Sequence, residues 1–405
     1  MTDVTKFLYK KIFDSDDSRG PINVYNVQKV FVCSESIEYP NIRFQSVETN
    51  DIINPIFEKT MSLSFLDNDD FFRYQKSEVL SILNTPMFFM CFNFDNYFHF
   101  IYDSLPYFLT YFEIKKEIPN LKILIPKTNL KKFVIETFEL LGIDDNDRVV
   151  ISNNYLYEKI YFSDSYTHGE NSNKKPHKSS LLIYEKLIKL ASTKTYNYKK
   201  FNKIYVSRRS WIHGDLSNIG TNYTDRRILT NETEVVNLLE KDNISEIFTE
   251  NMSMSDKINL FNKAELVIGP IGGGLVNCIF SKKNCNLLVI NSPTFLDVNM
   301  RFLFSFDNVN FKIYDNCYHV DDGVWKINQR VYVKNKNVFG EIIKISENKL
   351  LLNFTDEMIS GFSKENFFKS NWFLKKDCTS LDDGLNSPFK IDIENFKNFM
   401  YKSIL

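Results

Sequence analysis

The chain has 405 residues, which is too long for one ordinary domain. Its 50 Lys and Arg residues nearly balance 51 Asp and Glu residues, for a formal net charge of −1, and this argues against a nucleic-acid-binding protein, which normally carries a basic excess. Hydrophobic residues make up 43% and aromatic residues 15%, so the composition is that of a folded protein and not of a disordered one.

The beginning of the chain is charged and has no apolar segment of the kind found in signal peptides. No stretch approaches the ~20 apolar residues that a membrane span needs. The six cysteines form no CxxC pair, which fits free thiols in a reducing compartment. We expect a cytoplasmic protein without a transmembrane segment, and peripheral membrane association stays open.

Apolar strands and amphipathic helices alternate in the first half of the chain. The expected strands are residues 87–92, 121–125, 149–151 and 159–162, and the expected helices are residues 97–116, interrupted at Pro106, and 130–141, ended by Gly142. Residues 1–85 are less clear and predict only short strands, such as residues 29–33. The alternation predicts a parallel sheet with helices on both faces.

A polar stretch, residues 168–178 (HGENSNKKPHK), is the best candidate for a linker. The alternation then resumes. The expected strands are residues 203–207, 246–249, 265–269 and 287–291, and the expected helices are residues 180–190, 231–241, 255–263, with Ser255 as N-cap, and 274–281. This pattern predicts a second doubly wound unit.

The pattern changes near residue 323 to short alternating strands, at residues 331–333, 340–345 and 349–353, and a closing helix at 391–404. We therefore predict an α/β protein with two doubly wound, Rossmann-like domains facing a cleft and a small β-rich extension. The predicted boundaries are residues 1–175, 176–322 and 323–405.

A His–Asp pair follows the strand at residues 87–92. Asn96 is a good N-cap, and His99 and Asp103 then lie one helical turn apart on the same face. A helix N-terminus disfavours a protonated imidazole, and the carboxylate can fix the orientation and tautomer of the ring. The pair therefore suits a general base, although it could also merely stabilise the helix.

A glycine-rich turn joins the strand at 265–269 to the next helix. Gly272, Gly273 and Gly274 let the backbone approach a ligand closely, and the helix behind them offers amides to an anion. The spacing is GxxGGG, without the GxGxxG of dinucleotide sites or the GK[ST] of a P-loop. The turn predicts a phosphate or diphosphate site; a tight turn without ligand is the alternative.

Arginines cluster at the end of the strand at 203–207 and before the helix at 231–241. Ser207, Arg208 and Arg209 end the strand, and Arg227 precedes Asn231 and Glu232. Guanidinium groups suit the capture of phosphate oxygens. Glu232 could accept hydrogen bonds from ribose hydroxyls or simply cap its helix.

These motifs, taken in order, resemble glycosyltransferase family 61. The segments are N-x-x-H-x-x-x-D at Asn96, His99 and Asp103, S-R-R at 207–209, R-x-x-x-N-E at 227–232, and G-L-x-N at Gly274, Leu275 and Asn277. The resemblance covers roughly residues 90 to 293. It implies a GT-B fold and an inverting, metal-independent transfer from a nucleotide-sugar, with a UDP-sugar as the expected donor and a glycan hydroxyl as acceptor.

The resemblance implies that one domain carries the catalytic residues and the other binds the donor. His99 and Asp103 would be catalytic in the acceptor-side domain, and either could be the base. Ser207, Arg208, Arg209, Arg227, Asn231, Glu232, Gly272, Gly273, Gly274, Leu275 and Asn277 would bind the donor in the second domain. The reaction needs no cofactor beyond the nucleotide-sugar, and we expect a role in polysaccharide or glycan biosynthesis.

One position departs from the family pattern. The turn often reads H-G-A-G-L-x-N, and here Ile271 occupies the histidine position and Gly273 that of the alanine. A donor contact from that histidine would be lost. The alternative function is therefore a catalytically inactive nucleotide- or glycan-binding protein on the same fold. A sugar-nucleotide epimerase is disfavoured because GxGxxG and a Tyr-x-x-x-Lys pair are missing.

Overall fold

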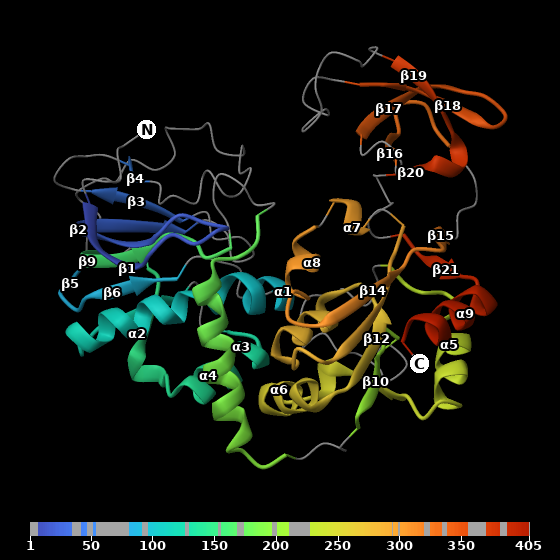
Figure 1. Cartoon of the computed structure of the whole chain (residues 1–405). Helices are drawn as coiled ribbons and strands as arrows, with labels where there is room; N and C mark the ends of the chain where they lie inside the picture. The colour runs from blue at the N-terminus through green and yellow to red at the C-terminus, as the bar shows by residue number, and fades with distance from the viewer. Residues whose placement is uncertain are drawn as a thin grey trace. The chain divides into compact units, whose positions relative to one another are not determined.

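The computed structural model describes most of the chain (Figure 1). The described residues are 7–34, 42–46, 52–53, 81–90, 96–125, 129–152, 155–167, 174–196, 201–209, 227–293, 295–298, 300–319, 325–333, 338–354, 370–380 and 387–404. They form two compact units. Unit 1 comprises Met1–Lys199, Asn218–Thr221 and Met252–Asn262, and unit 2 comprises Lys200–Ser217, Asn222–Asn251 and Lys263–Leu405.

Unit 1 is built on a mixed sheet with the strand order β4-β3-β2-β9-β6-β7-β8, in which β1 also pairs with β2 and β5 with β9. Its strands are β1 (Leu8–Phe13), β2 (Ile22–Ser34), β3 (Ile42–Ser46), β4 (Ile52–Ile53), β5 (Ser81–Leu83), β6 (Met87–Phe89), β7 (Lys122–Ile125), β8 (Arg148–Val150) and β9 (Tyr155–Ser163). β9, β6, β7 and β8 are parallel, as the alternation predicted. β1 to β4 add an antiparallel half from residues 1–85, for which the sequence predicted only short strands.

The helices of unit 1 follow the predicted order. They are α1 (Tyr97–His99), the π-helix η4 (Phe100–Ser104), α2 (Tyr107–Glu117), α3 (Lys132–Leu141), α4 (Leu181–Ser192) and α6 (Met254–Lys263). Gly142 ends α3 with a left-handed φ of 73°, the expected C-cap conformation. α4 contacts α2 and α3 and belongs to unit 1, and nearly all of α6 belongs to it too, whereas the predicted boundaries placed both helices in the second domain.

The predicted N-cap of α6 was wrong by two residues. Ser253, not Ser255, stands before the helix, where its Oγ accepts from the Asp256 amide at 3.1 Å and donates to the Asp256 carboxylate at 2.7 Å. Ser255 lies inside the first turn because the helix already begins at Met254. This reciprocal pair is a capping arrangement, and the helix therefore starts earlier than the apolar periodicity indicated.

Unit 2 contains an all-parallel sheet in the order β11-β10-β12-β13-β14. The strands are β10 (Lys203–Val206), β11 (Ser245–Ile247), β12 (Leu266–Pro270), β13 (Asn286–Ile290) and β14 (Asn310–Tyr314). The helical segments are α5 (Glu232–Glu240), the 3₁₀ turns η9 (Thr249–Asn251) and η10 (Gly273–Phe280), α7 (Phe295–Val298), α8 (Arg301–Phe304) and α9 (Ile393–Ser403). This is the predicted strand–helix alternation.

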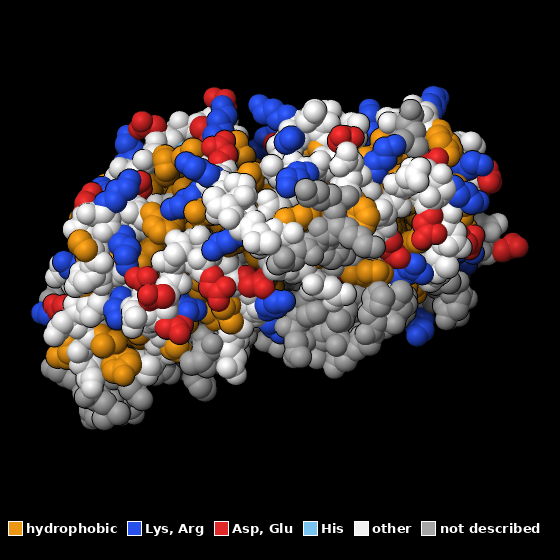
Figure 2. Space-filling view, turned by 90° about the horizontal axis from the view of Figure 1, so that it is seen from below, with side chains coloured by type: hydrophobic (Ala, Val, Ile, Leu, Met, Phe, Trp, Pro, Cys, Tyr) orange, Lys and Arg blue, Asp and Glu red, His pale blue; other side chains and the backbone are white. Residues whose placement is uncertain are grey.

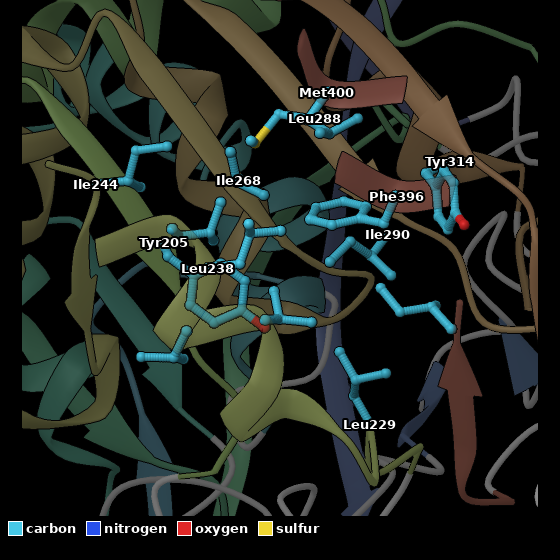
Figure 3. Packing of buried hydrophobic residues seen from close by; sticks show 14 of the residues in the cluster. Tyr205, Leu229, Leu238, Ile244, Ile268, Leu288, Ile290, Tyr314, Phe396 and Met400 are labelled. Atoms are coloured by element: carbon cyan, nitrogen blue, oxygen red, sulfur yellow. The ribbon is translucent and has the colours of Figure 1, made fainter. Parts of the chain in front are cut away.

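The core of unit 2 includes the end of the chain. Phe396 and Met400 of α9 pack against Ile268, Leu288 and other side chains of the parallel sheet (Figure 3). β15 (Cys317–His319) pairs antiparallel with β21 (Phe389–Ile391) just before this helix. The predicted closing helix thus completes the same hydrophobic core as β10, β12 and β13.

Between β15 and β21 the chain forms a separate antiparallel sheet, which we call the β-module. Its strands are β16 (Arg330–Val333), β17 (Val338–Ile345), β18 (Lys349–Asn353), β19 (Ser370–Leu374) and β20 (Cys378–Ser380), in the order β19-β18-β17-β16-β20. Val331, Ile342, Leu350 and Leu352 form the centre of a hydrophobic cluster of its own. The β-rich region predicted after residue 323 is therefore present.

Charges of both signs are intermixed on the face shown in Figure 2, as the net charge of −1 leads one to expect. Among the described residues, no helix combines the length and the apolar character that crossing a membrane requires.

Candidate functional site

The predicted His–Asp pair forms at the start of the first helical segment of unit 1. The Asn96 side chain accepts from the His99 amide at 3.3 Å and caps α1, as predicted. His99 Nδ1 lies 2.8 Å from Asp103 Oδ2. The Asp103 side chain is completely buried, whereas the His99 side chain is 30% exposed. The imidazole thus has one nitrogen on a buried carboxylate and an edge accessible to solvent.

The π-helical turn η4 begins directly after His99 and contains Asp103. Leu105 donates its amide to the Phe100 carbonyl, five residues back, at 3.0 Å. Pro106 has no N–H with which to continue the ladder. The Tyr184 hydroxyl of α4 instead donates to the carbonyls of Ile101, at 3.1 Å, and Tyr102, at 3.4 Å. π-helical turns occur frequently at functional sites, and this one keeps His99 and Asp103 in contact although the helix changes pitch between them.

The geometry favours one tautomer of His99. A buried carboxylate is an acceptor only, so Nδ1 must carry the proton that it donates to Asp103. The neutral ring then has its lone pair on Nε2, the arrangement that a general base needs. Burial raises the pKa of Tyr184 well above its usual value, and the charges of Tyr102 and Asp103 add to this effect. The Tyr184 hydroxyl therefore stays neutral and able to donate.

In unit 2, the Glu232 carboxylate accepts hydrogen bonds from residues at the end of β10. Its Oε1 accepts from the Ser207 hydroxyl at 3.0 Å, from the Arg208 amide at 2.9 Å and from the Tyr205 hydroxyl at 3.0 Å. Burial raises the pKa of Glu232, and these hydrogen bonds oppose the shift. Glu232 therefore fixes the strand end to the first turn of α5. Its other oxygen, Oε2, is buried without a hydrogen bond to the described residues.

The Arg208 side chain lies against the glycine-rich turn. A Cβ added to Gly272 would fall far inside the van der Waals radius of the Arg208 guanidinium. The backbone of Gly272 is extended, with a φ of 170°, so it is this close approach and not the backbone conformation that requires glycine. Burial lowers the pKa of Arg208, and the charges of Glu232 and Glu250 counter this shift. The Arg208 side chain thus brings the S-R-R motif into contact with the GxxGGG turn.

The helix behind the glycines is a 3₁₀ helix, η10. Its first internal bond runs from the Leu275 amide to the Gly272 carbonyl at 3.0 Å. The amides of Gly273 and Gly274 therefore precede the helical ladder, in the position from which helix N-termini bind anions. A Cβ on Gly274 would lie 2.9 Å from Val206 Cγ1, so glycine is also needed here for the packing of the turn on β10.

Arg227 lies in the same unit with an unusual backbone. Its φ is 52°, in the left-handed region that a residue of this size rarely adopts. Its guanidinium stacks over the Phe295 ring at 4.0 Å from the centroid. Backbone strain of this kind costs on the order of 1–3 kcal/mol and is common where a side chain must point in one direction.

Other predicted donor residues have structural partners. Arg209 forms a two-point ion pair with Glu246, with both N–O distances 2.7 Å. The Asn231 side chain donates from Nδ2 to the Ile391 carbonyl at 2.8 Å, and its Oδ1 accepts from the Ile391 backbone amide at 3.3 Å. Leu275 is buried, and the Asn277 side-chain Nδ2 donates to the Gly274 carbonyl within its own turn. These contacts shape the turn and the strand ends.

Ile271, the departure from the family pattern, is completely buried in unit 2, and its amide donates to the Ile290 carbonyl at 2.9 Å. The Ile271 side chain is therefore part of the hydrophobic interior of unit 2. Within the part of the chain that the structure describes, no group of three or more His, Cys, Asp or Glu side chains could hold a metal ion.

Two residues that support the segment carrying His99 and Asp103 were not predicted from the sequence. The Thr167 hydroxyl donates to Asp103 Oδ1 at 2.6 Å, although the two residues are 64 positions apart. Tyr184 supports the π-helical turn from α4. Neither belongs to a motif, and no spacing in the sequence could have joined them to Asp103.

Comparison with known proteins agrees with this assembly of motifs. Residues 97–288 match the family model described as Glycosyltransferase 61, and they include every residue predicted for catalysis or donor binding. No curated protein matches the chain. The match covers just under half of the chain and identifies residues 97–288 as a glycosyltransferase family 61 domain.

Proposed function

We propose that this protein is an inverting glycosyltransferase that moves a sugar from a nucleotide-sugar, with UDP as the expected nucleotide, to a hydroxyl group of a glycan. The observation that carries the proposal is the His99–Asp103 pair, in which a buried carboxylate holds Nδ1 of a partly exposed imidazole at 2.8 Å. The residues that we propose to bind the diphosphate lie in unit 2. A GT-B arrangement, with two Rossmann-like domains facing a cleft, is part of this proposal.

In the proposed reaction, the acceptor oxygen attacks the anomeric carbon while its proton passes to His99 Nε2. The bond from that carbon to the phosphate oxygen breaks, and the nucleoside diphosphate leaves with the electron pair. Inversion follows because the two oxygens are on opposite faces of the sugar. Asp103 stabilises the imidazolium that forms.

The leaving diphosphate needs positive charge. Arg208, Arg227 and the amides of Gly273 and Gly274 are the proposed source, and preorganised donors of this kind act without a metal ion. Arg209 contributes less in this proposal because its guanidinium is already paired with Glu246. Activity that survives EDTA would support the metal-independent form of the mechanism, and loss of activity that Mg²⁺ or Mn²⁺ restores would exclude it.

The test is a panel of nucleotide-sugars with glycan acceptors, assayed for transfer with the wild-type protein and His99→Asn. We expect the variant to lower kcat by about 10²–10⁴-fold, the usual contribution of a general base. Nucleoside diphosphate affinity, measured by calorimetry, should stay within about 3-fold, since His99 lies in unit 1. Wild-type turnover in the variant would remove His99 from the mechanism.

The alternative is a protein that binds a nucleotide or glycan without turnover. The observation that favours it is Ile271, whose buried side chain stands where the family pattern has a polar histidine. The same panel separates the two functions: binding of a nucleotide-sugar without transfer or hydrolysis, across all acceptors tested, would favour the alternative. A polysaccharide or glycan biosynthetic role and a cytoplasmic location remain part of the main proposal.

A further inference from the structure

Asp103 has a hydrogen bond on each carboxylate oxygen. Oδ2 faces His99 Nδ1 at 2.8 Å, and Oδ1 accepts from the Thr167 hydroxyl at 2.6 Å. Thr167 and Asp103 are both completely buried. The distance to Thr167 is that of a short, charge-assisted O–H···O⁻ bond. Thr167, Asp103 and His99 thus form a continuous chain from the interior of unit 1 to its surface.

The hydroxyl bond determines how Asp103 faces the imidazole. The terminal torsion of an aspartate has a broad, roughly two-fold profile, so the carboxylate plane is weakly fixed by its own rotamer. A second hydrogen bond, on the oxygen opposite His99, restricts that rotation. It also stabilises the ionised carboxylate in a buried place where an unpaired charge would be costly.

Thr167 is itself held from a distant part of the chain. Arg19, in the turn between β1 and β2, donates Nη2 to the Thr167 carbonyl at 2.6 Å. The same guanidinium donates to the carbonyls of Lys174 at 2.9 Å and Lys175 at 2.7 Å. The Asp16 carboxylate in turn accepts from the Arg19 amide at 2.7 Å. The backbone that carries Thr167 is therefore fixed by a planar, multiply bonded cation and not by a helix or strand.

We propose that Thr167 is a positioning residue for the His99–Asp103 pair, which aligns the Asp103 carboxylate so that His99 keeps its proton on Nδ1 and its lone pair on Nε2. The proposal rests on the proposed function only for its kinetic consequence. Its structural part concerns the tautomer of one histidine and holds whether or not the protein transfers sugar.

The first experiment is ¹⁵N NMR of the imidazole groups at a pH at which they are neutral. The chain has only five histidines, and His99→Asn identifies the signal of His99. We expect one tautomer, protonated on Nδ1, in the wild type and in Thr167→Ser, which keeps the hydroxyl. Thr167→Val has nearly the same shape without the hydroxyl, and we expect a mixture of tautomers. A wild-type tautomer in Thr167→Val would overturn the proposal.

The second experiment is kinetic and uses the donor and acceptor found by the panel. Thr167→Val should lower kcat about 10-fold or more and leave KM for both substrates within about 2-fold, because the base is misaligned while the binding residues are untouched. Thr167→Ser should recover most of kcat. An unchanged kcat in Thr167→Val, or an equal loss in Thr167→Ser, would contradict a positioning role.

Two results keep this inference distinct from the proposed function. If the wild type transfers no sugar, the function fails while the NMR result still decides the role of Thr167. If Thr167→Val does not fold, Arg19→Lys tests the same chain of contacts, since it keeps the hydroxyl but loses the planar group that fixes the Thr167 backbone. We then expect partial loss of the Nδ1 tautomer, and an unchanged tautomer would count against the proposal.

Discussion

At the scale of single residues, the proposed donor site of unit 2 depends on how closely Arg208 approaches the glycine-rich turn. The guanidinium occupies the space that a side chain at position 272 would need. The Arg208 guanidinium, which we propose to bind the diphosphate, can lie in this place only because residue 272 has no side chain. Gly272 acts through Arg208, and the two should be coupled energetically.

We predict that Gly272→Ala displaces the Arg208 guanidinium and weakens nucleoside diphosphate binding. Loss of a hydrogen bond to a charged group costs about 1.5–3 kcal/mol, equivalent to roughly a 10- to 100-fold rise in Kd. Calorimetry with UDP and other nucleoside diphosphates measures the effect. Gly20→Ala is the control, since its Cβ would also meet no atom within 4 Å and Gly20 is not among the proposed donor residues.

A double-mutant cycle with Arg208→Ala makes this prediction specific. If Gly272 acts only through Arg208, the double variant should bind no more weakly than Arg208→Ala alone, because contacting residues are not additive. Losses that simply add would mean that Gly272 affects the site by another route, for example through the turn itself.

At the scale of elements, the first helical segment of unit 1 combines a helix, a π-helical turn and a second helix. Periodicity predicted the helix from 97 to 116 and its interruption at Pro106, because proline's effect on a helix is local. The π-helical turn could not be predicted, since it depends on Tyr184, far away in sequence, to satisfy the carbonyls that Pro106 leaves. The helix break at Pro106 could be predicted from the local sequence, whereas the hydrogen bonds from Tyr184 could not.

We predict that Tyr184→Phe destabilises this turn. The carbonyls of Ile101 and Tyr102 would lose a donor in a buried place, at a cost of about 1–3 kcal/mol. Urea unfolding measures the loss, and hydrogen exchange should show it first in residues 100–105. Tyr318→Phe is the control, because Tyr318 is 43% exposed and water can replace its hydrogen bonds. Equal stability of the two variants would show that the turn does not need the hydroxyl.

The same contrast explains which site residues the sequence could assign. The glycine-rich turn was conspicuous because glycine is scarce in the chain, with 13 in 405 residues, and a run of three has few structural uses. Its binding of an anion stays a prediction. The orientations of Arg209 and Asn231 were not recognisable, since they depend on Glu246 and on the backbone of Ile391. Thr167 was missed for the same reason. A sequence motif predicts which residue type lies at a strand end, but it does not predict which distant residue its side chain will bind.

At the scale of the whole molecule, unit 2 is completed by residues beyond the matched family region. β21 binds the segment before α5, where the Thr230 amide donates to the Phe389 carbonyl at 2.8 Å and the Phe389 amide to the Ile228 carbonyl at 2.9 Å. This segment directly follows Arg227. The last strand and α9 thus stabilise the backbone that carries a proposed donor residue, and the β-module lies in the sequence between β15 and β21.

The pairing of β15 with β21 predicts that the β-module is an insertion that unit 2 can lose. His319 and Phe389 are paired residues, so their Cα atoms lie about 5 Å apart, and a short Gly–Ser linker can replace residues 323–386. We expect the shortened protein to fold with a Tm within about 4 °C of the wild type, equivalent to roughly 1 kcal/mol, and with unchanged nucleoside diphosphate affinity. Deletion of residues 389–404 is the contrasting variant and should unfold unit 2, because it removes Phe396 and Met400 from the core. If the variant that lacks the module also unfolds, or loses nucleotide affinity, then the module is part of the fold that forms the donor site and not an insertion into it.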